Sequence, residues 1–332
     1  MSTAQTPRWD VVGGGAASID ELVFVAGQLS DGKGRVLRRE MQFGGNILTA
    51  LVVAARAGAA TAFLGYLPGE TEEPALAALL RNEGIEAGAA RVTAGARAIH
   101  STVIVAVDGE RFIAFDDDIP VGMPADLDLD LVRAARVLLL DDYAVPAGLR
   151  AAKAGRAAGV EVVVDIERAG HPRTGELLDL ANHVIVPLNF ARRWTRVATP
   201  AATVQALWRN NKSAVVVTDG RQGCWYRSAE DVTGAVRHTP ALVVDVIDTT
   251  GCGDAFHGGY AAALARGATV HECVAAGTAA AAECAIHPGG IGPTGSHRGT
   301  PETLSPRLSV VSNAAAHPRG GEHLEQLTSR TP

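Results

Sequence analysis

The sequence of 332 residues is poor in aromatic residues, in cysteine and in positive charge. Only 5% of the residues are Phe, Trp or Tyr, which disfavours a site that recognises nucleobases by stacking. The net charge of −6 argues against non-specific binding to nucleic acids, which requires a basic face. The four cysteines show no C-x-x-C spacing, so we expect neither a zinc site nor a disulfide framework.

Long apolar runs are also missing. No stretch approaches the roughly 18 uninterrupted apolar residues of a membrane span, and the first residues contain no apolar signal core. We therefore expect a cytoplasmic protein with reduced thiols and no membrane contact. Apolar residues still make up 47% of the chain, which is enough to bury a large core.

From residue 130 onward, short apolar runs alternate with helical segments. These runs are rich in Val, Leu and Ile and do not alternate with polar residues, which is typical of a parallel sheet covered on both faces. They lie at residues 137–140, 160–164, 183–186 and 214–218. The pattern predicts a doubly wound α/β body with a mostly parallel sheet flanked by helices.

Two β-rich segments, residues 14–43 and 99–116, do not follow this rhythm. The second contains Asp108-Gly109, a strong hairpin signal. We expect the two segments to pair into a small second sheet that forms a lid over a ligand cleft and offers a surface for a homodimer. Residues 296–332 are polar and read as a disordered tail.

One stretch, residues 248–254, combines two aspartates with a glycine-flanked turn that leads into a helix expected at residues 255–266. We call it the anion turn, because backbone N–H groups and the helix dipole favour a phosphoryl group at such a place. Asp254 beside it could accept a proton from an attacking hydroxyl. The alternative is an ordinary tight turn whose aspartate caps the helix.

Two further patches accompany the anion turn. Gly44-Gly45-Asn46 opens a helix, and residues 218–223 read Thr-Asp-Gly-Arg-Gln-Gly. In this order and spacing the chain resembles the ribokinase-like carbohydrate kinases, the PfkB family, and most closely their ketohexokinase-like branch. The resemblance implies a ribokinase-like kinase domain at residues 9–295. It also implies transfer of the γ-phosphoryl group of ATP to a sugar hydroxyl, with Mg²⁺ and with K⁺ as a candidate activator.

The same resemblance assigns roles to individual residues. Asp254 falls on the catalytic base, and the anion hole falls on Gly251, Cys252 and Gly253. The sugar-binding candidates are Asp20, Asp31, Gly44, Gly45 and Asn46, although Asn46 could equally be the N-cap of its helix. The nucleotide-binding candidates are Asn189, Thr218, Gly220, Gly223 and Gly253. A monovalent cation would use the carboxylate of Asp248 and the carbonyl of Thr250.

The chain departs from the family pattern at Arg192, where an N-x-x-E element beginning at Asn189 would have glutamate. Mg²⁺ would then be held mainly by ATP phosphates and water, or Arg192 or Arg193 would contact a phosphate. His257 replaces a frequent asparagine and reads as a neutral polar contact. The open alternatives are a nucleoside or phosphosugar kinase and a non-catalytic sensor. A dehydrogenase rests only on residues 13–15, Gly-Gly-Gly.

Overall fold

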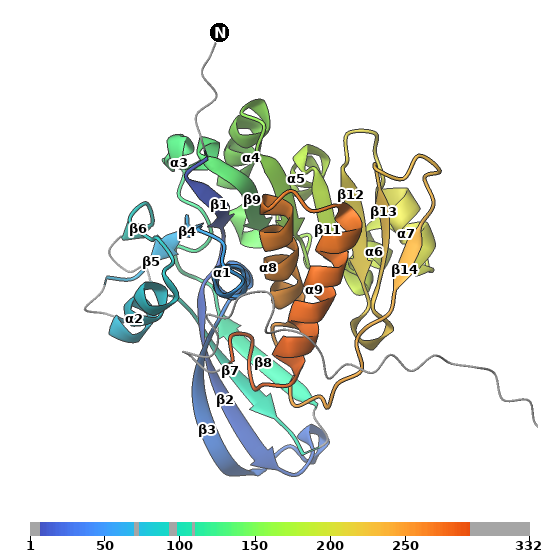
Figure 1. The fold of residues 1–332 in the computed structure, drawn as a ribbon. Helices are drawn as coiled ribbons and strands as arrows, with labels where there is room; N and C mark the ends of the chain where they lie inside the picture. Colours follow the sequence, from blue (N-terminus) through green and yellow to red (C-terminus); the bar gives the residue numbers. More distant parts are fainter. Residues whose placement is uncertain (1–6, 70–72, 93–97, 108–109, 293–332) are drawn as a thin grey trace, which may run out of the picture.

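The computed structural model describes residues 7–69, 73–92, 98–107 and 110–292. Its body is an eight-stranded sheet between two layers of helices (Figure 1), with strand order β14-β13-β12-β11-β10-β9-β1-β4. The strands are β1 (Trp9–Gly14), β4 (Thr61–Phe63), β9 (Ala135–Asp141), β10 (Glu161–Asp165), β11 (His183–Pro187), β12 (Ala214–Thr218), β13 (Cys224–Ser228) and β14 (Arg237–Thr239). The expected doubly wound α/β fold is confirmed.

Six of these strands run parallel, from β12 to β4 across the sheet. The four apolar runs expected as parallel strands correspond to β9, β10, β11 and β12. The antiparallel edge formed by β13 and β14 was not expected, because these strands are short and their sequences are only partly apolar. Ligands in such open sheets bind at the carboxyl ends of the parallel strands.

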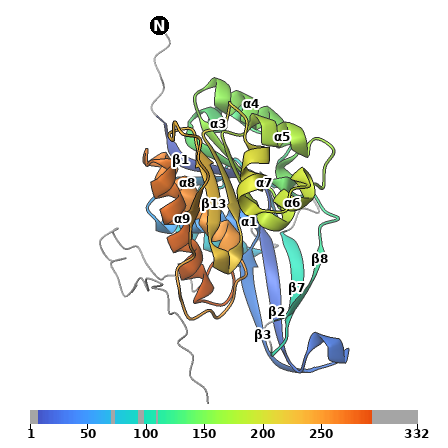
Figure 2. The ribbon, with the colours of Figure 1, turned by 90° about the vertical axis from the view of Figure 1, so that its right-hand side faces the viewer.

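The helices cover both faces of the sheet, as Figure 2 shows from the side. One face carries α1 (Asn46–Arg56), α8 (Cys252–Ala265) and α9 (Val270–Ala285), with α2 (Pro74–Glu83) beside α1. The other face carries α3 (Leu129–Arg133), α4 (Ala147–Ala157), α5 (Thr174–Leu180), α6 (Leu188–Thr195) and α7 (Pro200–Leu207). Each layer forms its own apolar core against the sheet.

Helix α8 lies between α1 and α9 and is apolar on nearly all sides, as expected for a buried helix. Its glycines permit this close packing. A Cβ atom on Gly258 would lie 2.3 Å from the carbonyl oxygen of Ala50, and one on Gly259 would lie 2.8 Å from that of Ala276. The helix begins at Cys252, three residues before the expected start at residue 255, so Asp254 belongs to its first turn.

The expected second sheet is also present, below the body in Figure 1. It consists of β3 (Arg35–Gly44), β2 (Ser18–Ala26), β7 (Ile99–Val105) and β8 (Arg111–Asp116), in that order. Strand β2 pairs in parallel with β7, which joins the two distant segments as predicted. The predicted turn at Asp108-Gly109 and the predicted tail at 296–332 lie outside the described residues.

Candidate active site

The anion turn forms the N-terminus of α8. Gly251 is the N-cap residue, with φ of 75°, and a Cβ atom there would lie 2.3 Å from Cα of Gly290. Glycine is therefore required for two reasons: the backbone is left-handed, and Gly290 leaves no room for a side chain. Within the first turn, N–H groups have no acceptor inside the helix, although that of Cys252 reaches the carbonyl of Thr249 at 3.4 Å. The remaining N–H groups and the helix dipole favour an anion beside Gly253.

Asp254 is the third residue of α8 and is partly buried. Burial raises the pKa of its carboxyl well above the ordinary value, and the nearby carboxylates of Asp165 and Glu167 raise it further. The carboxylate of Asp20 acts in the same direction, while His257 opposes the shift. Asp254 therefore lies within electrostatic reach of a lid residue, Asp20, and of the end of β10.

The sugar-binding candidates Asp20 and Gly44 are diagonal neighbours on the paired strands β2 and β3, where Asp20 pairs with Gln42 and Gly44 pairs with Ser18. The hydroxyl of Ser101 donates a hydrogen bond to Oδ1 of Asp20, and a Cβ atom on Gly44 would lie 2.4 Å from Oδ2. Gly45 has φ of 92° and packs against the backbone of Ala17. Gly44 thus leaves room for the Asp20 carboxylate, whose pKa is raised by burial.

Asn46 is not the N-cap of α1, because Gly45 occupies that position. The interpretation of Asn46 as a capping residue is therefore wrong. Its side-chain amide instead donates to Oδ2 of Asp165 at 3.3 Å. Nδ1 of His257 lies 3.4 Å from the same oxygen, so Asp165 joins the start of α1 to α8.

Asp31 is placed away from these groups. It belongs to a 3-10 turn, Leu29–Asp31, between β2 and β3, where its carboxylate accepts a hydrogen bond from the N–H of Gln28 at 3.0 Å. The register pairs Ser18 with Gly44 at one end of these strands and Ala26 with Arg35 at the other. Asp31 follows the second end, so within one chain the structure does not bring it to Asp20.

The nucleotide-binding candidates lie at the carboxyl ends of adjacent strands. Pro187, the last residue of β11, pairs with Thr218, the last residue of β12. Asn189 follows directly in α6 and is exposed. Gly220 and Gly223 both have positive φ, and a Cβ atom on Gly223 would lie 2.0 Å from the carbonyl oxygen of Thr239. The loop between β12 and β13 is therefore held tightly at Gly223.

Arg192 and Arg193 differ in where they point. Nε of Arg192 donates to the carbonyl of Ala198 at 2.7 Å, at the end of α6. Arg193 reaches the carbonyl of Glu167 at 3.3 Å. The exposed carboxylate of Glu167 lies beside the anion turn, since its Oε1 is 3.9 Å from the Cβ position built on Gly253. Glu167 is thus an acidic side chain close to the expected phosphate site.

Asp248 and Thr250, the expected cation ligands, are held in a dense network. Oδ1 of Asp248 accepts from the N–H of Thr250 at 2.9 Å, from its hydroxyl at 2.8 Å, and from Nη1 of Arg111 at 2.9 Å. Oδ2 accepts from the N–H of Gly289 at 2.9 Å. The thiol of Cys284 lies 3.3 Å from the carbonyl oxygen of Thr250.

His257 is buried within α8. Its Nδ1 lies 2.8 Å from the carbonyl of Gly253 and its Nε2 lies 3.3 Å from that of Ile185 in β11. Burial lowers its pKa. These contacts agree with the expected neutral polar role, but they join α8 to the sheet rather than facing open space.

The sequence did not single out Asp141, Asp165 or Glu167. Asp141 is fully buried and accepts backbone hydrogen bonds from Ala16 at 2.8 Å and from Tyr143 and Ala144, each at 3.0 Å. It therefore fixes the junction between β1 and β2, where the lid leaves the body. The sequence could have indicated two of them, because Asp141 and Asp165 each end an apolar strand of a parallel sheet, where ligands commonly bind.

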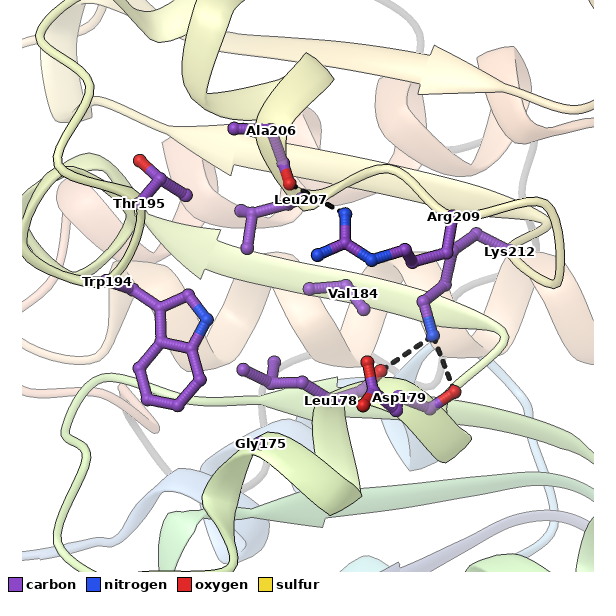
Figure 3. A pocket seen from close by; sticks show the side chains of 10 residues that line it. All are labelled: Gly175, Leu178, Asp179, Val184, Trp194, Thr195, Ala206, Leu207, Arg209 and Lys212. Carbon is purple, nitrogen blue, oxygen red and sulfur yellow. Dashed lines mark hydrogen bonds between the residues drawn. The ribbon is translucent and has the colours of Figure 1, made fainter.

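A groove of about 340 Å³ lies elsewhere, between α5, α6 and α7 (Figure 3). Nζ of Lys212 donates to the carbonyls of Leu178 and Asp179 at its edge, at 2.7 and 2.8 Å, and burial lowers the pKa of this lysine to about 8. None of the predicted site residues line this groove. Among the described residues, no helix is long and apolar enough to cross a membrane. In the same part of the chain, no group of three or more His, Cys, Asp or Glu side chains has an arrangement that could hold a metal ion.

The comparison with protein families decides the identity of this site. A model of the pfkB family carbohydrate kinases matches residues 15–295. This chain belongs to the PfkB family of carbohydrate kinases. It is therefore a sugar kinase, and the lid sheet and the anion turn are parts of one enzyme fold.

Individual relatives agree with the family. The chain is 32% identical to fructokinase-1 of Oryza sativa subsp. japonica over 236 residues, which is 65% of this chain and 71% of the rice protein. A crystal structure of a putative ribokinase from Agrobacterium tumefaciens is 26% identical, with a TM-score of 0.73 over 85% of this chain and 92% of that one. Arabidopsis thaliana ribokinase complexed with ribose and ATP, at 24% identity, shares the fold with a TM-score of 0.71 over 86% and 95% of the two chains.

Proposed function

We propose that this protein phosphorylates a hydroxyl group of a ketose, with D-fructose as the first candidate, and uses ATP as the donor. The observation that carries the proposal is the convergence of three chain segments. Asp20 of the lid lies within electrostatic reach of Asp254, and Asp165 joins Asn46 to α8. The similarity to fructokinases favours a ketose over an aldose.

Asp254 acts in this proposal as the general base. The sugar oxygen attacks the γ-phosphorus of ATP, the bond from that phosphorus to the β–γ bridging oxygen breaks, and ADP leaves. The hydroxyl proton passes to the Asp254 carboxylate and then to solvent. A carboxyl group whose pKa is raised accepts a proton more readily than an ordinary one, which suits a base working near neutral pH.

The anion turn stabilises the transferring group. N–H groups at the start of α8 point to the place where negative charge develops, and the 14-residue helix adds its dipole. Because Gly251 is fixed by its contact with Gly290, these donors are positioned before ATP arrives. Such preorganisation is the main contribution that a protein can make to phosphoryl transfer.

ATP enters the proposal with Mg²⁺, which neutralises phosphate charge when bound. No acidic side chain stands at position 192, since Arg192 is there and contacts Ala198. Glu167, exposed beside Gly253, fits the chemistry of a hard cation that keeps most of its water. Asn189, Thr218, Gly220 and Gly223 would line the nucleotide side of the same edge.

Cytoplasmic location and pairing of two copies through the lid stay predictions. Exposed apolar side chains on the lid sheet support the second, since such side chains gather where proteins associate. They are Leu37, Met41, Phe112, Ile113 and Phe115.

A substrate panel tests the proposed function. ADP release is measured with Mg²⁺ and ATP over ketoses, aldoses, sugar acids, sugar phosphates and nucleosides. The proposal expects the highest kcat/KM for a ketose. A nucleoside or a sugar phosphate as the best substrate would overturn the ketose assignment, and sugar binding without ADP release would favour a sensor over a kinase.

A further inference from the structure

Arg111 of the lid lies against the anion turn. It is the first residue of β8, and its guanidinium forms an ion pair with Asp248, 137 residues away, at 2.9 Å. Nη2 also donates to the hydroxyl of Thr249 at 2.8 Å, and Nη1 donates to that of Thr250. The side chains of Arg111 and Asp248 are only 28% and 15% exposed, so water screens this pair incompletely.

Both oxygens of the Asp248 carboxylate already accept hydrogen bonds from the protein. Each carboxylate oxygen offers about two lone pairs, and four donors surround Asp248, three of them at Oδ1 and one at Oδ2. They are Nη1 of Arg111, the N–H and hydroxyl of Thr250, and the N–H of Gly289. A monovalent cation at Oδ1 would have to displace one of its three donors, and a cation at Oδ2 would share a carboxylate that already forms an ion pair with the Arg111 guanidinium.

The second expected cation ligand is also engaged. The carbonyl oxygen of Thr250 lies 3.3 Å from Sγ of Cys284, and the carbonyl oxygens of Gly290 and Gly289 lie 3.6 and 3.9 Å from the same sulfur. Cys284 is buried, so its thiol fills the space among these three carbonyls. The residues present therefore do not fit K⁺ at either of the two predicted ligands.

We propose that Arg111 replaces the monovalent cation, so that this kinase works without K⁺ and receives the positive charge at its anion turn from the lid. The proposal rests on the proposed kinase function and concerns the same site. Strand β8 pairs with β7, and β7 pairs with β2, which carries Asp20. One sheet thus supplies both a sugar contact and the counter-charge of Asp248. Arg111 is a positioning residue, because its guanidinium contacts side chains of the anion turn rather than reacting atoms.

The first test compares turnover in potassium chloride with turnover in choline chloride of equal ionic strength. Wild type is expected to be equally active in both salts. Arg111→Gln is expected to lose about tenfold in kcat/KM in choline chloride, as for loss of one charge-assisted contact, and to recover part of it in K⁺. Adding Cys284→Ala to Arg111→Gln opens the Thr250 carbonyl as well and should increase the response to K⁺. Arg111→Lys keeps the charge and should stay insensitive to K⁺.

The matched control is Arg35→Gln. Arg35 is an exposed arginine of the same lid, at the end of β3 opposite Gly44, and its replacement should leave both activity and salt response unchanged. Activation of wild type by K⁺ of several fold would overturn the proposal. So would an Arg111→Gln variant that is as active as wild type in choline chloride, or one that loses activity but does not respond to K⁺.

A second readout needs no substrate. The melting temperature of wild type is expected to be the same in the two salts, whereas that of Arg111→Gln should rise in K⁺. Wild type that K⁺ stabilises would overturn the proposal. If no sugar is turned over, the kinase function fails while this comparison still decides whether Arg111 stands in for a cation.

Discussion

The first turn of α8 and the lid sheet supply groups to the same site, but the protein holds them differently. Helix α8 is packed between α1 and α9 through Gly258 and Gly259, so its first turn is fixed by the core. The lid has exposed apolar side chains and meets the turn through side-chain contacts such as that of Arg111 with Asp248. From this difference we expect the body to position the reacting groups and the lid to select the substrate, and the following variants test that division.

Among the variants considered, removal of the proposed general base should lower turnover the most. We expect Asp254→Asn to lower kcat by about 10²–10⁴-fold, because an amide cannot accept the hydroxyl proton. Steady-state ADP release measures kcat, and calorimetric binding of the sugar serves as the control. A variant with wild-type turnover would show that Asp254 is not the general base. It would also contradict the expectation that the first turn of α8 positions the reacting groups.

Changes in the lid should act on substrate binding. We expect Asp20→Asn to raise KM for the sugar by roughly 10–100-fold, because the site loses a charged acceptor for hydroxyl groups. Asp31→Asn is the matched control, since the turn between β2 and β3 places Asp31 away from Asp20 within one chain. Equal effects of the two substitutions on KM would contradict the different placement of these aspartates.

The rigidity of the anion turn can be tested with two glycines of similar backbone conformation. Gly251 and Gly267 have φ of 75° and 81°, but only Gly251 has a neighbouring backbone atom within 4 Å of a built Cβ. Gly267→Ala should cost about 1 kcal/mol of unfolding free energy, as expected for a left-handed residue. Gly251→Ala should cost clearly more and reduce turnover. Urea denaturation of the two variants checks the prediction, and equal losses would mean that the turn adapts.

The raised pKa of Asp254 predicts a small gain in stability when the carboxyl is removed. In wild type the folded pKa lies above the ordinary value of 3.8, so stability falls as pH rises through the shifted pKa. Asp254→Asn should therefore melt at a higher temperature than wild type at neutral pH, and the difference should vanish in acid. Melting curves over pH measure this. A variant less stable than wild type at neutral pH would show that the ionised carboxylate does not destabilise the folded protein there.

The sequence allowed the fold and one half of the site to be predicted because both depend on local patterns. Apolar runs located the parallel strands, and the glycines of the anion turn located Asp254. The start of α8 was misplaced by three residues, since cysteine and glycine are weak helix formers and gave no signal at residues 252 and 253.

The rest of the site depends on contacts between distant segments. The pair of Arg111 with Asp248 and that of Asn46 with Asp165 join residues 137 and 119 positions apart. Neither pair can be predicted from the local sequence, because the residues around a polar or charged side chain do not indicate whether it has a distant partner. The sequence alone therefore predicts Asp248 as a cation ligand, and its ion pair with Arg111 is visible only in the structure.

Detection of the phosphorylated sugar distinguishes a sugar kinase from a protein that only binds sugar. After incubation with ATP, Mg²⁺ and D-fructose, phosphorus NMR should show a sugar phosphate that forms in equal amount with ADP. Asp254→Asn should form neither product at a comparable rate. ADP without a sugar phosphate, or fructose binding with no phosphoryl transfer, would contradict the account that the lid and the anion turn form one sugar kinase site.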